Sequence, residues 1–163
     1  MTTTKPITPY AVISIADSGN TKLISEILAE LVNDDPLHVG TLYQEFDNIE
    51  SPYKQKTLFT VEQGRDILDF VDKVSSTVSA LYIHCHAGGS RSNAVASALE
   101  LRLGNKEGSD QYWKSNTCFP NSFVYKTLTE ISGLYDEQEL DRLMKMSLRA
   151  VDSWTSLFTE EEV

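Results

Sequence analysis

One short stretch of the chain carries residues that could do chemistry together. Five residues, two of them glycines, separate Cys85 from Arg91, and Ser92 follows directly. A cysteine thiolate is a strong nucleophile, and an arginine guanidinium can hold two oxygens of a phosphate at once. The glycines let the backbone curl tightly, so that successive N–H groups can point inward at an anion. This pattern indicates a site where a thiolate attacks a bound tetrahedral anion such as a phosphoester.

The residues on either side of this stretch predict a strand before it and a helix after it. The run at 80–83 is almost entirely apolar, as in a parallel strand buried on both faces. The run at 94–99 consists mostly of small residues, which favours a helix packed close to a sheet. Open α/β sheets bind ligands at the carboxyl ends of their strands, and the start of a helix attracts an anion. We therefore expect Cys85 to end a strand beneath an anion, and to be a thiolate at neutral pH.

A buried structural cysteine is the alternative interpretation of Cys85. A cysteine and an arginine six positions apart occur often by chance, so the spacing by itself favours that alternative. Here the apolar strand, the glycines, the arginine, the hydroxyl residue and the small-residue helix follow one another along the chain. Because a phosphate site needs all of these features together, their agreement favours a reactive cysteine.

Hydrophobic periodicity predicts an α/β fold for the rest of the chain. Apolar runs at 11–15 and 37–46 indicate two further strands. Helical spacing indicates helices at 21–32 and 121–131. Capping boxes, formed by Thr60 with Gln63 and by Asp136 with Glu139, indicate the starts of helices at 60–73 and from 136 onward. This order predicts a three-layer sandwich in which helices flank a central, mostly parallel sheet. We find no repeat and no linker, so we expect a single domain over residues 1–163.

The charge of the chain limits its partners. Among 163 residues, 24 are acidic and 14 are lysine or arginine, which gives a formal net charge of −10. Broad binding to nucleic acid or to an anionic membrane needs a basic surface, so we expect neither partner. We find no targeting segment, no apolar run long enough to span a membrane, and only two cysteines, too few for a disulfide framework. We expect a cytoplasmic monomer.

The stretch from His84 to Ser92 resembles the signature of the cysteine-based protein tyrosine and dual-specificity phosphatases. It reads His-Cys-His-Ala-Gly-Gly-Ser-Arg-Ser, and weaker matches to small bacterial and phage-type members lie at 13–15, 46–47 and 58–60. The resemblance spans about residues 11 to 131. It implies a phosphatase-like fold and hydrolysis of a phosphomonoester, with a phosphorylated protein or a small phosphomonoester as substrate. It implies no metal or other cofactor.

The resemblance also implies a role for each residue of the stretch. Cys85 would attack phosphorus and form a cysteinyl-phosphate, and Arg91 would bind the phosphate and stabilise the transition state. Ser92 would assist hydrolysis of that intermediate, while His84 would order the loop and tune the thiolate. Backbone amides would bind the phosphate oxygens, and they belong to His86, Ala87, Gly88, Gly89, Ser90 and Arg91.

A phosphatase of this kind also needs an acid that protonates the leaving oxygen. The family places an aspartate on a separate upstream loop, and Asp47, 38 residues before Cys85, takes that position. Relatives often have two consecutive aspartates there, whereas this chain has Asn48 at the second place. Glu45 and Glu50 are alternative acids. An ordinary loop aspartate is the structural alternative for Asp47.

Other functions also use a cysteine that follows a strand. Sulfur transferases and arsenate reductases do so, but the five residues between Cys85 and Arg91 and the mid-chain position of the loop favour a phosphatase. A phosphate-binding module without turnover is a further alternative, against which the presence of Cys85, Arg91 and Ser92 together argues. Cys118 is either a buried residue or the partner of Cys85 in a protective disulfide, because reactive thiolates oxidise readily.

The net charge narrows the substrates that the resemblance implies. A charge of −10 favours a small phosphoester, or a phosphopeptide with basic flanking residues, over a polyanion. The depth of the pocket determines which phosphorylated residues it accepts. A deep pocket would select phosphotyrosine, and a shallow one would also admit phosphoserine and phosphothreonine.

Overall fold

The structure is a computed structural model, and the part of the chain that it describes comprises residues 6–20, 22, 25, 26, 29, 32, 34–86, 88–114 and 119–159, with side chains up to residue 148. The chain divides into two compact units, Met1–His86 and Ala87–Val163. The boundary falls directly after Cys85 and His86, within the stretch that predicts the phosphate site.

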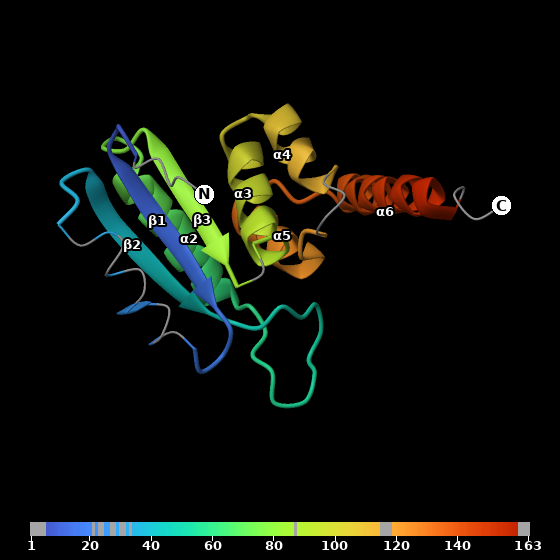
Figure 1. The fold of residues 1–163 in the computed structure, drawn as a ribbon, viewed down its shortest axis with the longest axis horizontal. Coiled ribbons are helices and arrows are strands. Elements are labelled where there is room, and N and C mark those ends of the chain that lie inside the picture. Colours follow the sequence, from blue (N-terminus) through green and yellow to red (C-terminus); the bar gives the residue numbers. More distant parts are fainter. Residues whose placement is uncertain are drawn as a thin grey trace. The chain divides into compact units, whose positions relative to one another are not determined.

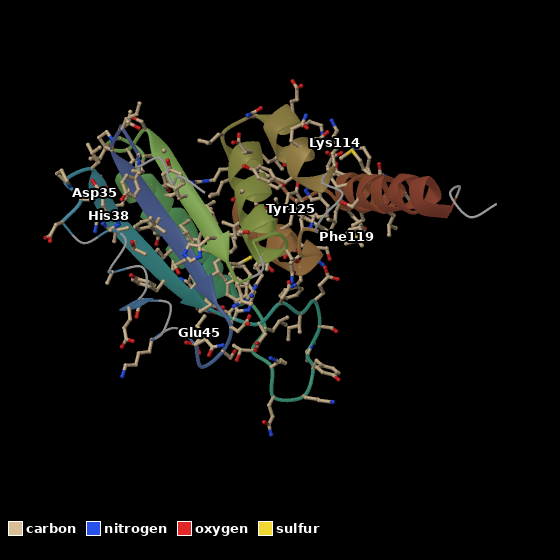
Figure 2. The ribbon with its side chains drawn as sticks, in the orientation of Figure 1. Asp35, His38, Glu45, Lys114, Phe119 and Tyr125 are labelled. Carbon is tan, nitrogen blue, oxygen red and sulfur yellow. The ribbon has the colours of Figure 1, made fainter. Side chains whose placement is uncertain are left out.

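The first unit is built on a parallel sheet (Figure 1). Its strands β1 (Tyr10–Ala16), β2 (His38–Glu45) and β3 (Ala80–Cys85) lie in the order β2-β1-β3, and both neighbouring pairs are parallel. Every residue of the central strand β1 is buried. Figure 2 shows Glu45 at the carboxyl end of β2 and His38 at its opposite end. The predicted parallel sheet is confirmed, and each strand covers most of the apolar run that predicts it.

Helix α2 (Val61–Val74) begins with the capping box that the sequence predicts. The Thr60 hydroxyl accepts from the Gln63 amide at 3.2 Å, and the Gln63 side chain accepts from the Thr60 amide at 3.0 Å. The Gln63 side chain also donates to the main-chain oxygen of Glu45 at 2.9 Å. A Cβ atom added at Gly40 of β2 would lie 3.9 Å from the Phe70 ring. These contacts pack α2 against the sheet and fix its start near the carboxyl end of β2.

In the described residues, the second unit is formed by helices. They are α3 (Arg91–Arg102), α4 (Lys106–Trp113), α5 (Ser122–Ile131) and α6 (Glu137–Thr159). Helices α3, α5 and α6 lie where the patterns predict them. The patterns miss α4, because its only large apolar side chains are Tyr112 and Trp113 at its end.

Buried hydrogen bonds join α3, α4 and α6 of the second unit, and a ring contact adds α5. The Trp113 Nε1 donates to the Ser97 hydroxyl at 2.8 Å, and that hydroxyl lies 2.8 Å from the hydroxyl of Ser109. The Ser147 hydroxyl donates to the carbonyl oxygen of Trp113 at 2.7 Å. The ring of Tyr125, labelled in Figure 2, meets the Trp113 ring edge to face at 5.3 Å between centroids. Trp113 is therefore the centre of this unit's interior.

The second predicted capping box, at the start of α6, forms on one side. The Asp136 carboxylate accepts from the amides of Gln138 and Glu139 at 2.9 and 3.2 Å. The carboxylate of Glu139 instead accepts from Arg142, at 2.6 and 2.8 Å, and from Lys106 of α4. Tertiary ion pairing with α4 thus takes the place of the local bond that the pattern predicts.

Some predictions concern residues that the structure does not describe, and others concern how the two units are arranged relative to each other. The predicted helix over 21–32 falls largely outside the described residues, and Cys118 lies outside them as well. The parallel sheet and its helix α2 confirm an α/β fold. The three-layer arrangement and the single domain over residues 1–163 stay predictions. Across the described helices, none has the length and apolar character needed to cross a membrane.

Candidate functional site

The carboxyl ends of the three strands meet at one edge of the sheet in the first unit. In register, Ile15 of β1 lies between Gln44 of β2 and Cys85 of β3. Neighbouring strands are about 4.8 Å apart, so about 10 Å separates the ends of β2 and β3. Ser18 follows the end of β1, and Asp47 follows the end of β2. Cys85 and Asp47 are therefore brought to the same edge, where parallel sheets bind ligands.

Cys85 and His84 end strand β3. Cys85 is 6% exposed, and its predicted position at a strand end is confirmed, while its role as nucleophile stays a prediction. His84 lies opposite Ser14 in the register. Its Nε2 is buried and has no hydrogen-bond partner among the residues that the structure describes. Burial lowers the pKa of His84, so its ring is neutral at neutral pH. A neutral ring can order a loop through a hydrogen bond but adds no positive charge beside the thiol.

Asp47 is buried, and its hydrogen bonds close the loop that follows β2. The Ser18 hydroxyl donates to its Oδ2 at 2.7 Å, and the Thr57 amide donates to the same oxygen at 2.8 Å. The Lys56 ammonium lies 3.0 Å from Oδ1. The amide of Asp47 donates to the carbonyl oxygen of Thr57 at 2.8 Å. These bonds close the loop from 47 to 57 and tie it to the turn after β1.

The same contacts set the charge of Asp47. Burial by itself would raise its pKa, but the hydrogen bonds from Thr57, Ser18 and Lys56, together with the charge of Lys56, outweigh burial and lower the pKa to about 2. The carboxyl group is therefore ionised at neutral pH in this arrangement. A general acid must carry a proton, so Asp47 can serve as one only after some of these donors leave it.

The alternative acids and the second aspartate position lie around the same loop. Glu45 accepts a hydrogen bond from the Gly19 amide at 2.6 Å. Glu50 and Asn48 are both exposed. Glu45 thus joins the ends of β1 and β2, in the same manner as Asp47 with Ser18.

A cavity of about 640 Å³ opens beside Asp47. The lining residues that the structure describes lie in the first unit, and they are Ser18, Asp47, Tyr53, Lys54, Gln55 and Lys56. The volume is that of a site for a side chain or a small molecule. Sequence reasoning missed this cavity. The signal that could have found it is a pair of lysines, Lys54 and Lys56, in a short loop of an acidic chain.

The remaining residues of the phosphate stretch begin the second unit. Gly88 has a φ of +68°, a left-handed conformation that glycine adopts without steric penalty. Arg91 is the first residue of α3, as predicted, and both Arg91 and Ser92 are buried. The carbonyl oxygen of Ser90 accepts from the Asn121 amide at 3.1 Å, which ties the start of α3 to the start of α5.

Three further residues of the stretch complete this account. His86 is exposed, Gly89 is buried, and Ala87 lies outside the described residues. His84, Cys85, His86 and Asp47 belong to the first unit, whereas Gly88 to Ser92 belong to the second. The closure of a phosphate loop around Cys85 by Arg91 therefore stays a prediction.

The chain is thus an α/β protein whose parallel sheet presents a cysteine and an aspartate at its carboxyl edge. No family model matches the chain, and no curated protein matches it. Among solved structures it is similar to one described as the crystal structure of Tk-PTP in the active form, with 19% identity and a TM-score of 0.49 over 77% of this chain and 79% of that chain. A likeness of this size carries no functional conclusion, so the function proposed for this chain is drawn from its own residues.

Proposed function

We propose that the chain is a phosphomonoester hydrolase of the protein tyrosine or dual-specificity phosphatase type. The observation that carries this proposal is a cysteine at the carboxyl end of a parallel strand, followed six residues later by an arginine at the start of a helix. In the first step the Cys85 thiolate attacks phosphorus, and the bond to the leaving oxygen breaks. In the second step water attacks the cysteinyl-phosphate, the sulfur–phosphorus bond breaks, and inorganic phosphate leaves.

Arg91 and the backbone amides from His86 to Arg91 bind the phosphate in this proposal. The position of Arg91 as the first residue of α3 supports it, because the positive end of a helix and a guanidinium both attract an anion. The left-handed turn at Gly88 supports a curled loop. Ser92 assists hydrolysis of the intermediate, and the neutral His84 orders the loop.

Asp47 is our candidate for the acid that protonates the leaving oxygen. Its place at the same sheet edge as Cys85 supports this role. Its three donors oppose it, because they keep the carboxyl group ionised. We propose that binding of an anionic substrate draws the Lys56 ammonium away from Asp47. Loss of that donor and of its charge would raise the pKa of Asp47, because the burial that favours the protonated form would then be less opposed.

Hydrolysis of an aryl phosphate by purified variants tests the proposal. We expect phosphate release in the presence of a metal chelator, and its loss in both Cys85→Ser and Arg91→Ala. The exposed Lys73 on α2 provides a control, since Lys73→Ala changes surface charge away from the site. Circular dichroism verifies that each variant is folded. Activity that survives Cys85→Ser, or that requires a divalent metal, would refute the mechanism.

One observation favours a second candidate, a phosphate-binding module without turnover. The ionised, triply hydrogen-bonded Asp47 is what such a module would retain if its loop had only to stay closed. Phosphopeptide binding by the unmodified chain, with no release of phosphate over hours, would establish the module and exclude the hydrolase.

A further inference from the structure

The loop after β2 carries a lysine, Lys54, that the proposed chemistry at Cys85 does not use. Lys54 and Lys56 both line the cavity of about 640 Å³ beside Asp47. Asp47 is the only acidic residue in the described lining, so the lining has an excess of positive charge. The whole chain carries a net charge of −10. This cavity is therefore a local exception to the charge of the molecule.

The two lysines of the cavity differ in what holds them. The Lys56 ammonium is paired with Asp47 at 3.0 Å. The Lys54 ammonium lies 5.0 Å from the centroid of the Tyr53 ring, and within the described part of the chain no carboxylate forms an ion pair with it. An aromatic face holds an exposed ammonium only weakly. Lys54 is thus a cation that an incoming anion can bind.

The backbone turns at Lys54 and Gln55. The φ of +45° at Lys54 lies in the left-handed region, which is uncommon for a residue other than glycine. Residues 51–57 are all exposed, and Tyr53 retains 55% of its surface. A ligand can therefore reach the Lys54 ammonium and the Tyr53 ring from solvent.

The distance to Cys85 determines which part of a substrate reaches this cavity. The loop leaves the end of β2, which lies two strand spacings, or about 10 Å, from the end of β3. An extended peptide advances about 3.3 Å per residue. A peptide whose phosphorylated residue sits at Cys85 would thus bring a residue about three positions away to the end of β2, where the loop that lines the cavity begins.

We propose that this cavity, lined by Tyr53, Lys54, Gln55 and Lys56, binds a second anionic side chain of a phosphopeptide substrate, about three residues from the phosphorylated one. The second anion is a carboxylate or a phosphate, because a lysine acts as a point charge that accepts either. This inference rests on the proposed phosphatase function. The net charge of the chain predicts a preference for peptides with basic flanking residues. This inference predicts a preference for acidic ones, because the charge nearest the peptide has the largest effect on its binding.

Matched phosphotyrosine peptides test the inference. They share one sequence and carry alanine, glutamate or a non-hydrolysable phosphonate three residues before or after the phosphotyrosine. In the unmodified chain we expect kcat/KM for at least one glutamate or phosphonate peptide to exceed that of its alanine counterpart by about threefold, the size of an exposed ion pair. Comparison of the glutamate and phosphonate peptides distinguishes the two anions.

Substitutions at Lys54 assign the preference to the cavity. The ratio of interest is kcat/KM for the acidic peptide divided by kcat/KM for its alanine counterpart. We expect Lys54→Ala to reduce this ratio to about one, and Lys54→Arg and the control Lys73→Ala to retain it. Because the pair is exposed, 0.5 M salt should reduce the ratio in the unmodified chain. Because both values in the ratio come from the same variant, any effect of the substitution that is common to all peptides cancels.

Two failures are distinguishable. If the peptides are hydrolysed at equal rates, the cavity does not select the second anion, although the phosphatase function stands. If no peptide is hydrolysed, the proposed function fails, and binding of the same labelled peptides by fluorescence anisotropy tests the cavity. Tighter binding of an acidic peptide that Lys54→Ala removes would support the cavity, and equal binding would overturn it.

Discussion

Asp47 has two conflicting requirements placed on it by its surroundings. Asp47 holds the loop from 47 to 57 closed, and for this it needs its negative charge, because the Ser18 hydroxyl, the Thr57 amide and the Lys56 ammonium all donate to it. As a general acid it needs a proton. The two roles are compatible only if some of these contacts are lost during each turnover.

The dependence on the leaving group measures whether Asp47 donates that proton. We expect Asp47→Asn to lower kcat on phenyl phosphate by about 100-fold or more, and KM by far less, because the phenol oxygen leaves poorly without an acid. On p-nitrophenyl phosphate, whose leaving oxygen needs little protonation, the loss should be much smaller. Equal losses on both substrates would place the acid elsewhere, with Glu45 and Glu50 as the next residues to replace.

Helix α4 shows how an element without a local signal can be held by its neighbours. Its eight residues have no apolar stripe, yet Trp113 is almost wholly buried and donates to Ser97 of α3. Ser109 reaches the same hydroxyl, and Ser147 of α6 donates to the Trp113 carbonyl oxygen. The helix is therefore fixed by polar contacts to two other helices, in addition to the burial of one large ring.

Removal of the Ser97 hydroxyl tests this account of α4. We expect Ser97→Ala to lower the free energy of unfolding by about 2 kcal/mol, because it leaves the buried Trp113 N–H without its acceptor. Urea unfolding followed by circular dichroism gives this quantity, and the exposed Ser76 supplies the control variant Ser76→Ala. The double variant Ser97→Ala/Trp113→Phe should cost less than the sum of the single changes. Strict additivity would contradict a direct bond between the two side chains.

Two ionised carboxyl groups, one in each unit, make the stability of the molecule depend on acidity. Asp47 in the first unit has a pKa lowered to about 2. In the second unit, hydrogen bonds from Arg142 and Lys106 outweigh burial and lower the pKa of Glu139 to about 2 as well. A carboxyl group whose pKa is lower in the folded state stabilises that state above its unfolded pKa, near 4, and ceases to do so as the pH falls through its folded value.

We therefore expect the free energy of unfolding to decrease as the pH falls from about 4 to about 2. At pH 7, Asp47→Asn should cost about 2 kcal/mol, because it weakens charge-assisted hydrogen bonds, and Glu139→Gln about 1 kcal/mol, because its ion pairs are partly exposed. Urea unfolding at a series of pH values tests this: each variant should lose less stability than the unmodified chain between pH 4 and pH 2. A variant with the unchanged pH dependence would exclude that carboxyl group as a cause.

The sequence by itself determined the features that depend on local order. Apolar runs located β1, β2 and β3, and the Thr60 and Gln63 pair located the start of α2, because these signals reside in consecutive residues. The spacing of Cys85 and Arg91 likewise indicated a phosphate site before any geometry was known. The start of α3 at Arg91 confirms the local part of that prediction.

Only the tertiary structure decided the charge of Asp47 and the cavity beside it. The donors to Asp47 are Ser18, 29 residues earlier, and Lys56 and Thr57, 9 and 10 residues later. No periodic pattern relates these positions, and they meet because the parallel register of β1 and β2 brings the turn after one strand to the loop after the other. Local order thus specified which residues could react. The pairing of distant strands set the proton affinity of the candidate acid, because it brought the Ser18 hydroxyl to Asp47.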